Sequence, residues 1–319
     1  MRAVRYDGYG AADVLYVADI AEPEPGPGEV KLRIRAASLN PLDGKARAGH
    51  LRFLPMFRGP PRGTGCDVAG EIVAVGGGAA PRHMGERVFG SISPMVRNGS
   101  FAEYAVMPAD SLAAIPEGVE FEQAAALPLA GGMALQALTD HARLAAGERV
   151  LITGAAGGVG HFAVQIAKHL GAHVVGVCSA ANVEFVRGLG ADEVVDYGRD
   201  DFTRRADRFD VVFDAACASS FAAARHVLTE TGCYINTAGS AAAAIDAAAS
   251  AVVARITSRQ RVIVFPVSAG SATWQRLATL AASGAVRPHI ERRITLEDTA
   301  DAQRAMETRH GRGKVIVVP

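Results

Sequence analysis

The chain has 319 residues, enough for two domains, because a single hydrophobic core seldom grows beyond about 250–300 residues. Lys plus Arg and Asp plus Glu are equal at 33 each, so the formal charge is zero and nothing in it attracts nucleic acid or an anionic membrane. The composition therefore favours a small-molecule ligand.

The cysteines and the first residues predict a reduced, cytoplasmic protein. The four cysteines are far apart and include no C-x-x-C pair, so neither a disulfide framework nor a zinc knuckle is indicated. Residues 1–14 carry Arg and Asp and lack the apolar core of a signal peptide. The most apolar long run, 237–253, is rich in alanine and contains Asp246, so we interpret it as a covering helix and expect no membrane span.

The first part of the chain, to about Pro116, is typical of a small, irregular all-β domain. Short runs rich in β-branched and aromatic residues alternate there with Gly and Pro, which interrupt strands. The expected strands are residues 1–6, 14–20, 29–39, 69–77, 86–92 and 101–108.

From about Glu120 to Gly284, apolar strands alternate with helical stretches. This alternation predicts a doubly wound parallel sheet with right-handed crossovers. A short helix at 296–308 and a last strand at 314–319 follow, and we expect this tail to return to the first domain. The expected strands of the sheet are residues 150–154, 173–178, 193–197, 209–216, 233–239 and 262–268.

The segment VLITGAAGGVG, residues 150–160, is typical of the turn that binds the pyrophosphate of a dinucleotide. Glycines let backbone N–H groups approach the phosphates, and the N-terminus of the following helix, 161–172, adds partial positive charge. The motif reads Ala155-x-Gly157-x-x-Gly160, with alanine in place of the first glycine. A tight packing turn without a ligand is the alternative interpretation.

The residue after the next strand indicates which dinucleotide binds. An NAD site normally places Asp or Glu there, against the adenosine ribose, whereas this chain has Ser179. The missing carboxylate favours NADPH. Ser179, Asn182 and Tyr197 are the candidate donors to its 2′-phosphate, and none of them is a cation. Arg187 lies about two turns into the next helix, and we interpret it as a solvated charge.

Several further segments occur in a recognisable order: residues 38–49, 63–76, 125–138, 152–174, 186–197 and 311–319. Together they resemble the medium-chain dehydrogenase/reductase superfamily, and within it the zinc-free quinone oxidoreductases close to ζ-crystallin and the chloroplast-envelope homologues. The resemblance implies an α/β fold with two domains. Residues 1–120 with 286–319 would form a GroES-like irregular β domain, and residues 121–285 a Rossmann doubly wound parallel sheet.

The resemblance also implies site residues. Asn40 and Lys45 are the candidate donors to the oxygen on which negative charge develops. By the resemblance, Asn40 would lie beside the nicotinamide and the substrate, and Lys45 stands where bacterial quinone oxidoreductases have a Tyr considered for proton delivery. The alternatives are a simple turn at Asn40 and a surface charge at Lys45. Asp43 and Arg47, four residues apart, are expected to pair. The implied cofactor-binding residues are Ala156, Gly157, Gly158, Val159, Gly160, Ser179, Asn182, Tyr197, Thr237, Phe265, Val267 and Lys314.

Zinc-dependent members of the superfamily hold a catalytic zinc at positions that here correspond to Asn40, Cys66 and Asp67. One cysteine and one carboxylate fall short of the three protein ligands that such a site needs, so we expect a metal-free enzyme. An irregular site that adds His83 is the alternative. The chain also has Ala181 and Asn182 where relatives carry Arg and Lys, and Met133 where a Thr is usual.

The resemblance implies an NADPH-dependent enzyme that transfers hydride to a conjugated enone or a quinone, acceptors that need no Lewis acid. Phe53, Leu54, Met56 and Phe57 would form an apolar lid over the substrate or, alternatively, part of the core. Two other functions remain open: an NADPH-binding structural or regulatory protein with vestigial catalysis, and a reductase dedicated to one biosynthetic intermediate. By the same resemblance, strand 262–268 is expected to pair with its copy in a homodimer.

Overall fold

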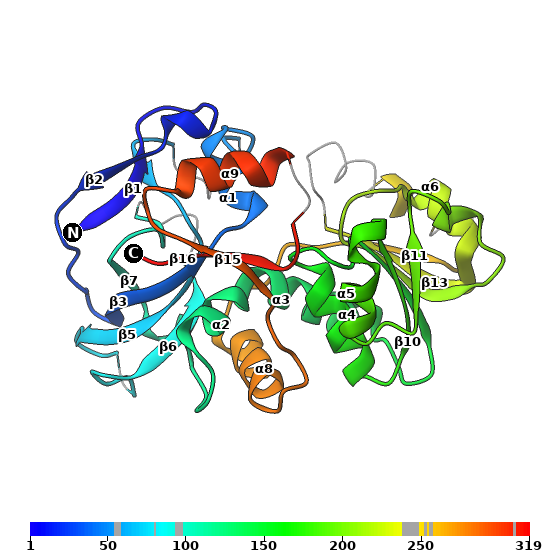
Figure 1. Cartoon of the computed structure of the whole chain (residues 1–319). Coiled ribbons are helices and arrows are strands. Elements are labelled where there is room, and N and C mark those ends of the chain that lie inside the picture. The colour runs from blue at the N-terminus through cyan, green and yellow to red at the C-terminus, as the bar shows by residue number, and fades with distance from the viewer. Residues whose placement is uncertain are drawn as a thin grey trace. The chain divides into compact units, whose positions relative to one another are not determined.

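The computed structural model describes residues 1–53, 59–79, 81–92, 98–237, 249–251, 254, 258–308 and 311–319. Leu54, Met56 and Phe57 of the expected lid, and most of the run 237–253, lie outside the described residues. The chain forms two compact units (Figure 1). Unit 1 comprises Met1–Gly132, Ser268–Gly284 and Pro288–Pro319, and unit 2 comprises Met133–Val267 and Ala285–Arg287.

Unit 1 is built from two β-sheets. The smaller sheet has the order β2 (Tyr16–Asp19), β1 (Arg2–Tyr6), β4 (Arg62–Gly63). The larger sheet has the order β15 (Ile290–Ile294), β16 (Lys314–Val317), β3 (Glu29–Ser38), β5 (Asp67–Val75), β6 (Arg87–Ser91), β8 (Ala113–Ala114), and β7 (Tyr104–Pro108) also pairs with β3. The C-terminal tail belongs to this sheet, because β16 pairs antiparallel with the end of β3.

The helices of unit 1 include segments that we expected in the other domain. Residues 121–132 and 268–284 were both expected in the dinucleotide domain, yet their contacts place them in unit 1. Trp274 of α8, for example, donates its indole N–H to the carbonyl of Ser111, 3.1 Å away. The described helices of unit 1 are α1 (Pro41–Arg47), α2 (Phe121–Ala126), α8 (Ser271–Ala282), α9 (Thr299–Thr308) and the short helices Ala12–Val14 and Ala109–Ser111, while α3 (Pro128–Leu135) contains the boundary between the units at residues 132 and 133.

Strand β3 carries the chain from the surface of unit 1 into its interior. Leu32 and Ile34 are buried whereas Arg33 and Arg35 are exposed, the alternation expected of a strand with one face on the core. From residue 36 every position is buried, and Ser38 is 0% exposed. The end of β3 therefore delivers its polar residues into a dry environment, where they need hydrogen-bonding partners.

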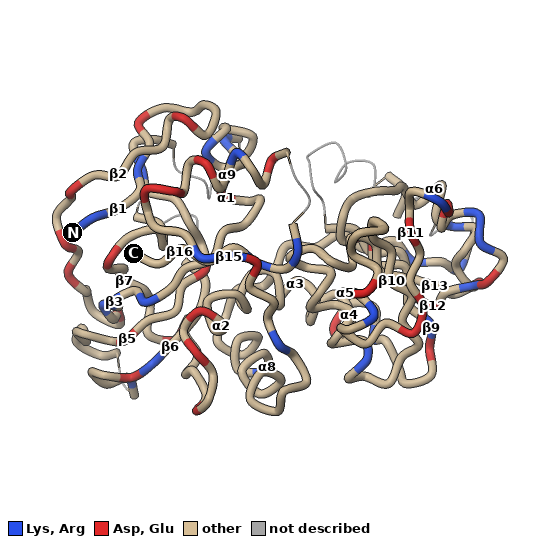
Figure 2. Tube along the Cα trace, viewed as in Figure 1, with Lys and Arg blue, Asp and Glu red and all other residues tan. Residues whose placement is uncertain are grey.

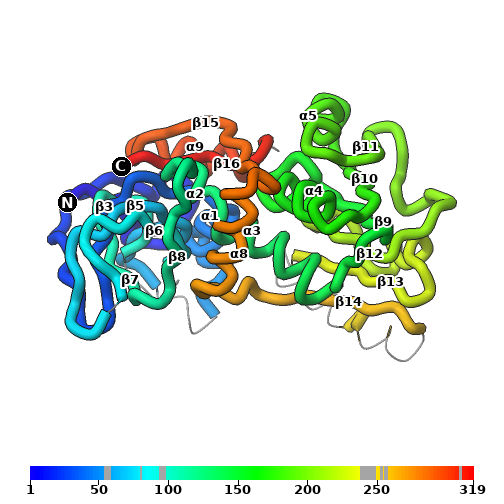
Figure 3. The backbone as a smooth tube through the Cα atoms, turned by 90° about the horizontal axis from the view of Figure 1, so that it is seen from below, coloured from blue at the N-terminus to red at the C-terminus, as the bar shows by residue number. Residues whose placement is uncertain are grey.

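Unit 2 is a doubly wound parallel sheet, as predicted. Its strands have the order β11 (Glu193–Asp196), β10 (His173–Cys178), β9 (Arg149–Thr153), β12 (Phe209–Asp214), β13 (Leu228–Asn236), β14 (Arg261–Val264), which Figure 3 shows from one edge to the other. The order reverses between β9 and β12, and ligands of such sheets bind outside the carboxyl ends at that point. The helical segments of unit 2 are Gln136–Ala142 (a π-helix), α4 (Gly160–His169), Ala180–Asn182, α5 (Val183–Gly188), Phe202–Arg204, α6 (Phe221–Ala224) and Arg225–Val227.

Charged residues of both signs are interspersed along the two units (Figure 2). Within the described ranges, no helix combines the length and the apolar character needed to cross a membrane.

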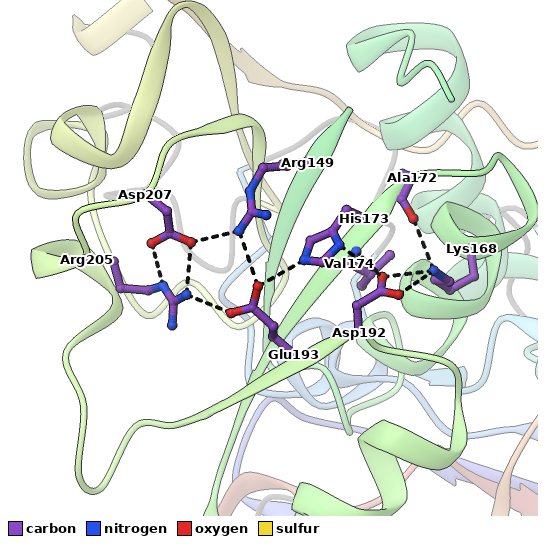
Figure 4. Close-up of polar contacts among 9 residues, drawn as sticks. All are labelled: Arg149, Lys168, Ala172, His173, Val174, Asp192, Glu193, Arg205 and Asp207. Carbon is purple, nitrogen blue, oxygen red and sulfur yellow. Dashed lines mark hydrogen bonds and ion pairs between the residues drawn. The ribbon is translucent and has the colours of Figure 1, made fainter. Parts of the chain in front are cut away.

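At the amino ends of β9, β10 and β11, a network of ion pairs joins neighbouring strands (Figure 4). Glu193 Oε1 lies 2.9 Å from His173 Nε2, and Glu193 Oε2 accepts from Arg205 at 2.8 Å. Asp207 accepts from both Arg149 and Arg205. This network lies at the edge opposite the carboxyl ends, so we assign it a structural role.

We predict that Glu193→Gln destabilises the protein most at neutral pH. The hydrogen bond with His173, together with those from Arg205 and Arg149, lowers the pKa of Glu193. A lowered carboxyl pKa contributes stability above the unfolded-state pKa, and this contribution is lost as the pH falls through the folded-state pKa. Because Glu193 is 39% exposed, solvent screening limits the cost to about 1 kcal/mol.

Thermal unfolding followed by circular dichroism at neutral and acidic pH measures this difference. Glu184→Gln is the matched control, because Glu184 is 84% exposed and pairs with Arg187 on one helix. A Glu193→Gln variant as stable as Glu184→Gln at neutral pH would contradict the structural role of the network.

Candidate functional site

The glycine-rich turn after β9 has the backbone geometry of a phosphate-binding turn. Gly154 adopts a φ of 59°, a left-handed conformation that favours glycine, and Ala155 follows it with its N–H bonded to the carbonyl of Val177. Ala155 is therefore tolerated at the first motif position, because the residue before it makes the tight bend. A Cβ on Gly160 would lie 2.0 Å from the carbonyl oxygen of Gly154, so only glycine lets α4 approach the turn this closely.

This turn also has donors available for an anion. Gly157, Gly158 and Val159 are partly exposed, while Ala156 is 4% exposed and packs inward. Within the described part of the chain, the N–H groups of Gly158, Val159 and Gly160 have no protein acceptor. Unpaired N–H groups at the N-terminus of a ten-residue helix suit a pyrophosphate.

The three residues predicted to bind the 2′-phosphate follow the carboxyl ends of β10 and β11. Strands β10 and β11 pair Cys178 with Asp196, so Ser179 and Tyr197 follow at adjacent positions. The N–H of Tyr197 donates to the carbonyl of Cys178, and the side chain of Asn182 donates to Ser179 Oγ at 3.1 Å. Tyr197 is 58% exposed, which leaves its hydroxyl accessible.

Two of the remaining cofactor candidates are adjacent as well. Strands β13 and β14 pair Asn236 with Val264, so Thr237 and Phe265 follow side by side. Phe265 contacts the ring of His141, with 4.0 Å between the ring centroids. Val267 is the last residue of this segment in unit 2 and is half-buried.

The sequence reasoning missed a buried carboxylate beside the glycine turn, Asp214 at the end of β12. It is 0% exposed and accepts from Thr153 at 2.5 Å, from Tyr234 at 2.8 Å, and from the backbone N–H groups of Ala218 and Ser219. These bonds tie the ends of β9, β12 and β13 together. The only signal in the sequence was an Asp that ends an apolar run.

In unit 1, the predicted catalytic residue Asn40 lies within a buried polar cluster. Its Oδ1 accepts from Lys314 Nζ at 2.6 Å, and its Nδ2 donates to Asp67 Oδ2 at 2.9 Å and to the carbonyl of Ser38 at 3.2 Å. Asn40 is 3% exposed, Lys314 3% and Asp67 0%. The ammonium of Lys314 and the carboxylate of Asp67 are 3.8 Å apart, so the two buried charges compensate each other.

These contacts change the expected chemistry of two residues. Both amide hydrogens of Asn40 already have acceptors, so Asn40 has no donor left for a developing oxyanion, the role that we predicted for it from the sequence. Its Oδ1 can still accept one more hydrogen bond. Lys314 was predicted to contact the cofactor; in unit 1 its ammonium is buried and donates to Asn40 and to the carbonyl of Leu39.

Helix α1, which follows Asn40, carries Asp43 and Lys45. Asp43 is 2% exposed and accepts from the N–H of Asn40 at 2.8 Å and from Cys66 Sγ at 3.4 Å. The expected Asp43–Arg47 pair is wrong, because the guanidinium of Arg47 instead bonds to Gln303, Glu307 and the carbonyl of Gly10. Lys45 is half-buried on the same helix.

The described side chains do not gather the ligands that a metal site needs. Among the residues that the structure describes, no three His, Cys, Asp or Glu side chains are placed to hold a metal ion. Cys66 and Asp67 are adjacent, but His83, the third ligand of the irregular alternative, is 73% exposed and lies 3.5 Å from Glu86.

We predict that Asp43→Asn stabilises the protein more at pH 8 than at pH 5. Burial, together with the nearby Asp67, raises the pKa of Asp43 to about 7. In the unfolded chain Asp43 ionises near pH 4, whereas in the folded chain it stays protonated up to about pH 7. The free energy of unfolding of the wild type therefore falls as the pH rises from about 4 to about 7. Asn does not ionise, so the gain in unfolding free energy of Asp43→Asn over wild type should be larger at pH 8 than at pH 5 by at least about 1.4 kcal/mol.

The fluorescence of Trp274 during urea unfolding measures this effect, because the single tryptophan is buried in unit 1. Asp110→Asn, at an exposed carboxylate of the same unit, is the control and should show no such pH dependence. An advantage of Asp43→Asn that is constant with pH would contradict the raised pKa.

Two families match parts of the chain. Residues 26–117 match the alcohol dehydrogenase GroES-like domain, and residues 189–317 match the family described as zinc-binding dehydrogenase. The irregular β domain of unit 1 is therefore GroES-like, as expected.

Relatives match the chain along its whole length. A chloroplast envelope quinone oxidoreductase homolog of Arabidopsis thaliana is 36% identical over 100% of this chain and 98% of its own length. An NADPH-dependent alkenal/one oxidoreductase of the same plant, described as chloroplastic, is 32% identical over 100% of this chain and 80% of its own length. The solved quinone oxidoreductase of Coxiella burnetii has a TM-score of 0.89 at 30% identity and covers 100% of this chain and 99% of its own. The chain therefore belongs to the medium-chain dehydrogenase/reductase superfamily and is an oxidoreductase of its quinone oxidoreductase branch.

Proposed function

We propose that this protein uses NADPH to reduce a conjugated enone or a quinone. The observation that carries the proposal is the glycine turn of unit 2, whose unpaired N–H groups at the start of α4 suit a pyrophosphate. The absence of a carboxylate at Ser179 supports NADPH over NADH. The Arabidopsis relative, an NADPH-dependent alkenal/one oxidoreductase, supports both the cofactor and the acceptor.

The residues at the carboxyl edge of unit 2 would hold the cofactor. The turn from Ala156 to Gly160 would bind the pyrophosphate, and Ser179, Asn182 and Tyr197 would donate to the 2′-phosphate. Thr237, Phe265 and Val267 would contact the part of the cofactor that lies off β13 and β14. When bound, NADPH supplies a hydride.

In unit 1, Asn40 and Lys45 would serve the acceptor in different ways. The remaining lone pair on Asn40 Oδ1 can accept a hydrogen bond from an N–H or O–H group of the cofactor, and the contacts with Lys314 and Asp67 hold the carboxamide in one orientation. A carboxamide does not release a proton, so we assign the proton to the ammonium of Lys45, which would protonate the enolate or hydroquinone anion left by hydride transfer. Lys45 is half-buried on α1, five residues beyond Asn40.

We also propose a homodimer and a cytoplasmic location. Among the described strands, β14 pairs only with β13, and its Val262, Ile263 and Val264 are half-exposed, so this edge can pair with a second copy. None of the four cysteines, all of which lie in the described residues, forms a disulfide, which suits a reducing compartment. Light scattering at several protein concentrations measures the mass, and a monomer throughout would contradict the dimer.

The proposed reaction is tested by the loss of NADPH absorbance in stopped flow, with a panel of enones, quinones and alcohols. At least one enone or quinone should oxidise NADPH faster than it does without protein. Oxidation of an alcohol with no reduction of any enone or quinone would contradict the proposal. NADPH binding without turnover of any compound would favour the non-catalytic alternative.

The same assay tests Lys45. Removing a positioned proton donor costs about 10² or more in rate, so Lys45→Met should lower kcat by about that factor while NADPH binding is unchanged. Lys168→Met, at a lysine that pairs with Asp192 in unit 2, is the control. A kcat equal to that of wild type would exclude Lys45 as the donor.

A further inference from the structure

The loop after β11 holds a basic residue that lies outside the cofactor motifs, Arg199. Its N–H donates to the carbonyl of Asp196 at 3.0 Å, as does the N–H of Asp200. Asp196 Oδ1 accepts from the N–H of Gly198, also at 3.0 Å. The loop is therefore a closed turn, and the backbone of Arg199 has a fixed position at the end of the strand.

This turn lies beside the segment predicted to bind the 2′-phosphate. Neighbouring strands of a sheet are about 4.8 Å apart, and β10 and β11 pair Cys178 with Asp196. The turn from Asp196 to Asp200 and the segment from Ser179 to Asn182 therefore leave the same edge of the sheet at adjacent positions. In doubly wound sheets, the ribose that carries the 2′-substituent lies off the end of the second strand, here β10.

The side chain of Arg199 is accessible and only weakly restrained. The side chain is 83% exposed, and its Nε lies 3.6 Å from Asp196 Oδ2. That separation is longer than the 2.7–2.9 Å or so of a charge-assisted hydrogen bond. Asp196 is 16% exposed and already accepts from Gly198, so its carboxylate stays in place if the guanidinium turns toward another anion.

We propose that Arg199 is the cation that binds the 2′-phosphate of NADPH and that Asp196 limits the preference for NADPH over NADH. The inference rests on the proposed function and deepens it. Ser179, Asn182 and Tyr197 supply neutral donors, and Arg199 supplies the charge-assisted, bidentate contact that a phosphate favours. The cation therefore comes from the loop after β11 and not from the segment after β10, where this chain has Ala181 and Asn182.

Asp196 opposes this contact in two ways. Its carboxylate repels the phosphate, and it attracts the guanidinium that the phosphate needs. NADH carries no 2′-phosphate, so the Arg199–Asp196 pair persists when NADH binds. Two substitutions at this turn should therefore change the cofactor preference in opposite directions.

The test measures kcat/KM with NADPH and with NADH for two variants. A charge-assisted hydrogen bond at an exposed site is worth about a factor of ten, so Arg199→Gln should lower kcat/KM for NADPH about tenfold and leave that for NADH unchanged. Asp196→Asn keeps the acceptor for Gly198 and removes the charge, so it should raise kcat/KM for NADPH by about threefold. Calorimetric binding of adenosine 2′,5′-bisphosphate and of adenosine 5′-monophosphate provides a readout that does not depend on turnover.

Arg204→Gln is the matched control. Arg204 is 86% exposed and lies 3.4 Å from Asp201 in the same i,i+3 relation, but it precedes Arg205, which joins the network at the opposite edge of the sheet. This variant should keep the wild-type ratio of NADPH to NADH. If Arg199→Gln also keeps the wild-type ratio and the affinity for the bisphosphate, the assignment of Arg199 is overturned. If wild type itself does not bind NADPH, the proposed function fails first, and the two failures are thereby distinguished.

Discussion

The parallel register of the strands in unit 2 is the constraint on which the cofactor site depends. Parallel pairing brings the carboxyl ends of β9 to β14 to one edge, so residues far apart in the sequence become neighbours. The ion pairs at the amino ends join β9, β10 and β11 at the opposite ends of these strands, and Asp214 ties three strands together beside the glycine turn. At the carboxyl ends of the strands, the hydrogen bonds of Asp214 therefore hold the backbone beside the unpaired N–H groups of the glycine turn.

In unit 1, the corresponding constraint is the burial of charge. Lys314 and Asp67 are 247 residues apart in number, yet both lie in the interior, where an isolated charge would be costly. Each compensates the other, and Asn40 bonds to both of them. This arrangement fixes the carboxamide of Asn40 and uses up its donors, so its chemistry differs from what its residue type alone suggested.

Local patterns determined much of the fold. The period-two alternation along β3, the apolar runs of unit 2 and the glycine turn are patterns within a few consecutive residues, and the structure has a strand or a turn at each of them. The motif order was specific enough to identify the family. Alanine is tolerated at the first motif position, residue 155, because the positive φ of the turn falls on Gly154.

What the sequence by itself could not determine depends on contacts between distant segments. Nothing near Asn40 in the sequence indicates that Lys314 would occupy its oxygen, and the i,i+4 spacing of Asp43 and Arg47 predicted a pair that the contacts of Arg47 with Gln303 and Glu307 replace. Arg199 likewise became a candidate only when β11 was placed beside β10. The sequence determined the elements and the family because those depend on local periodicity and motif order, whereas only the tertiary structure decided which charges and donors are already satisfied.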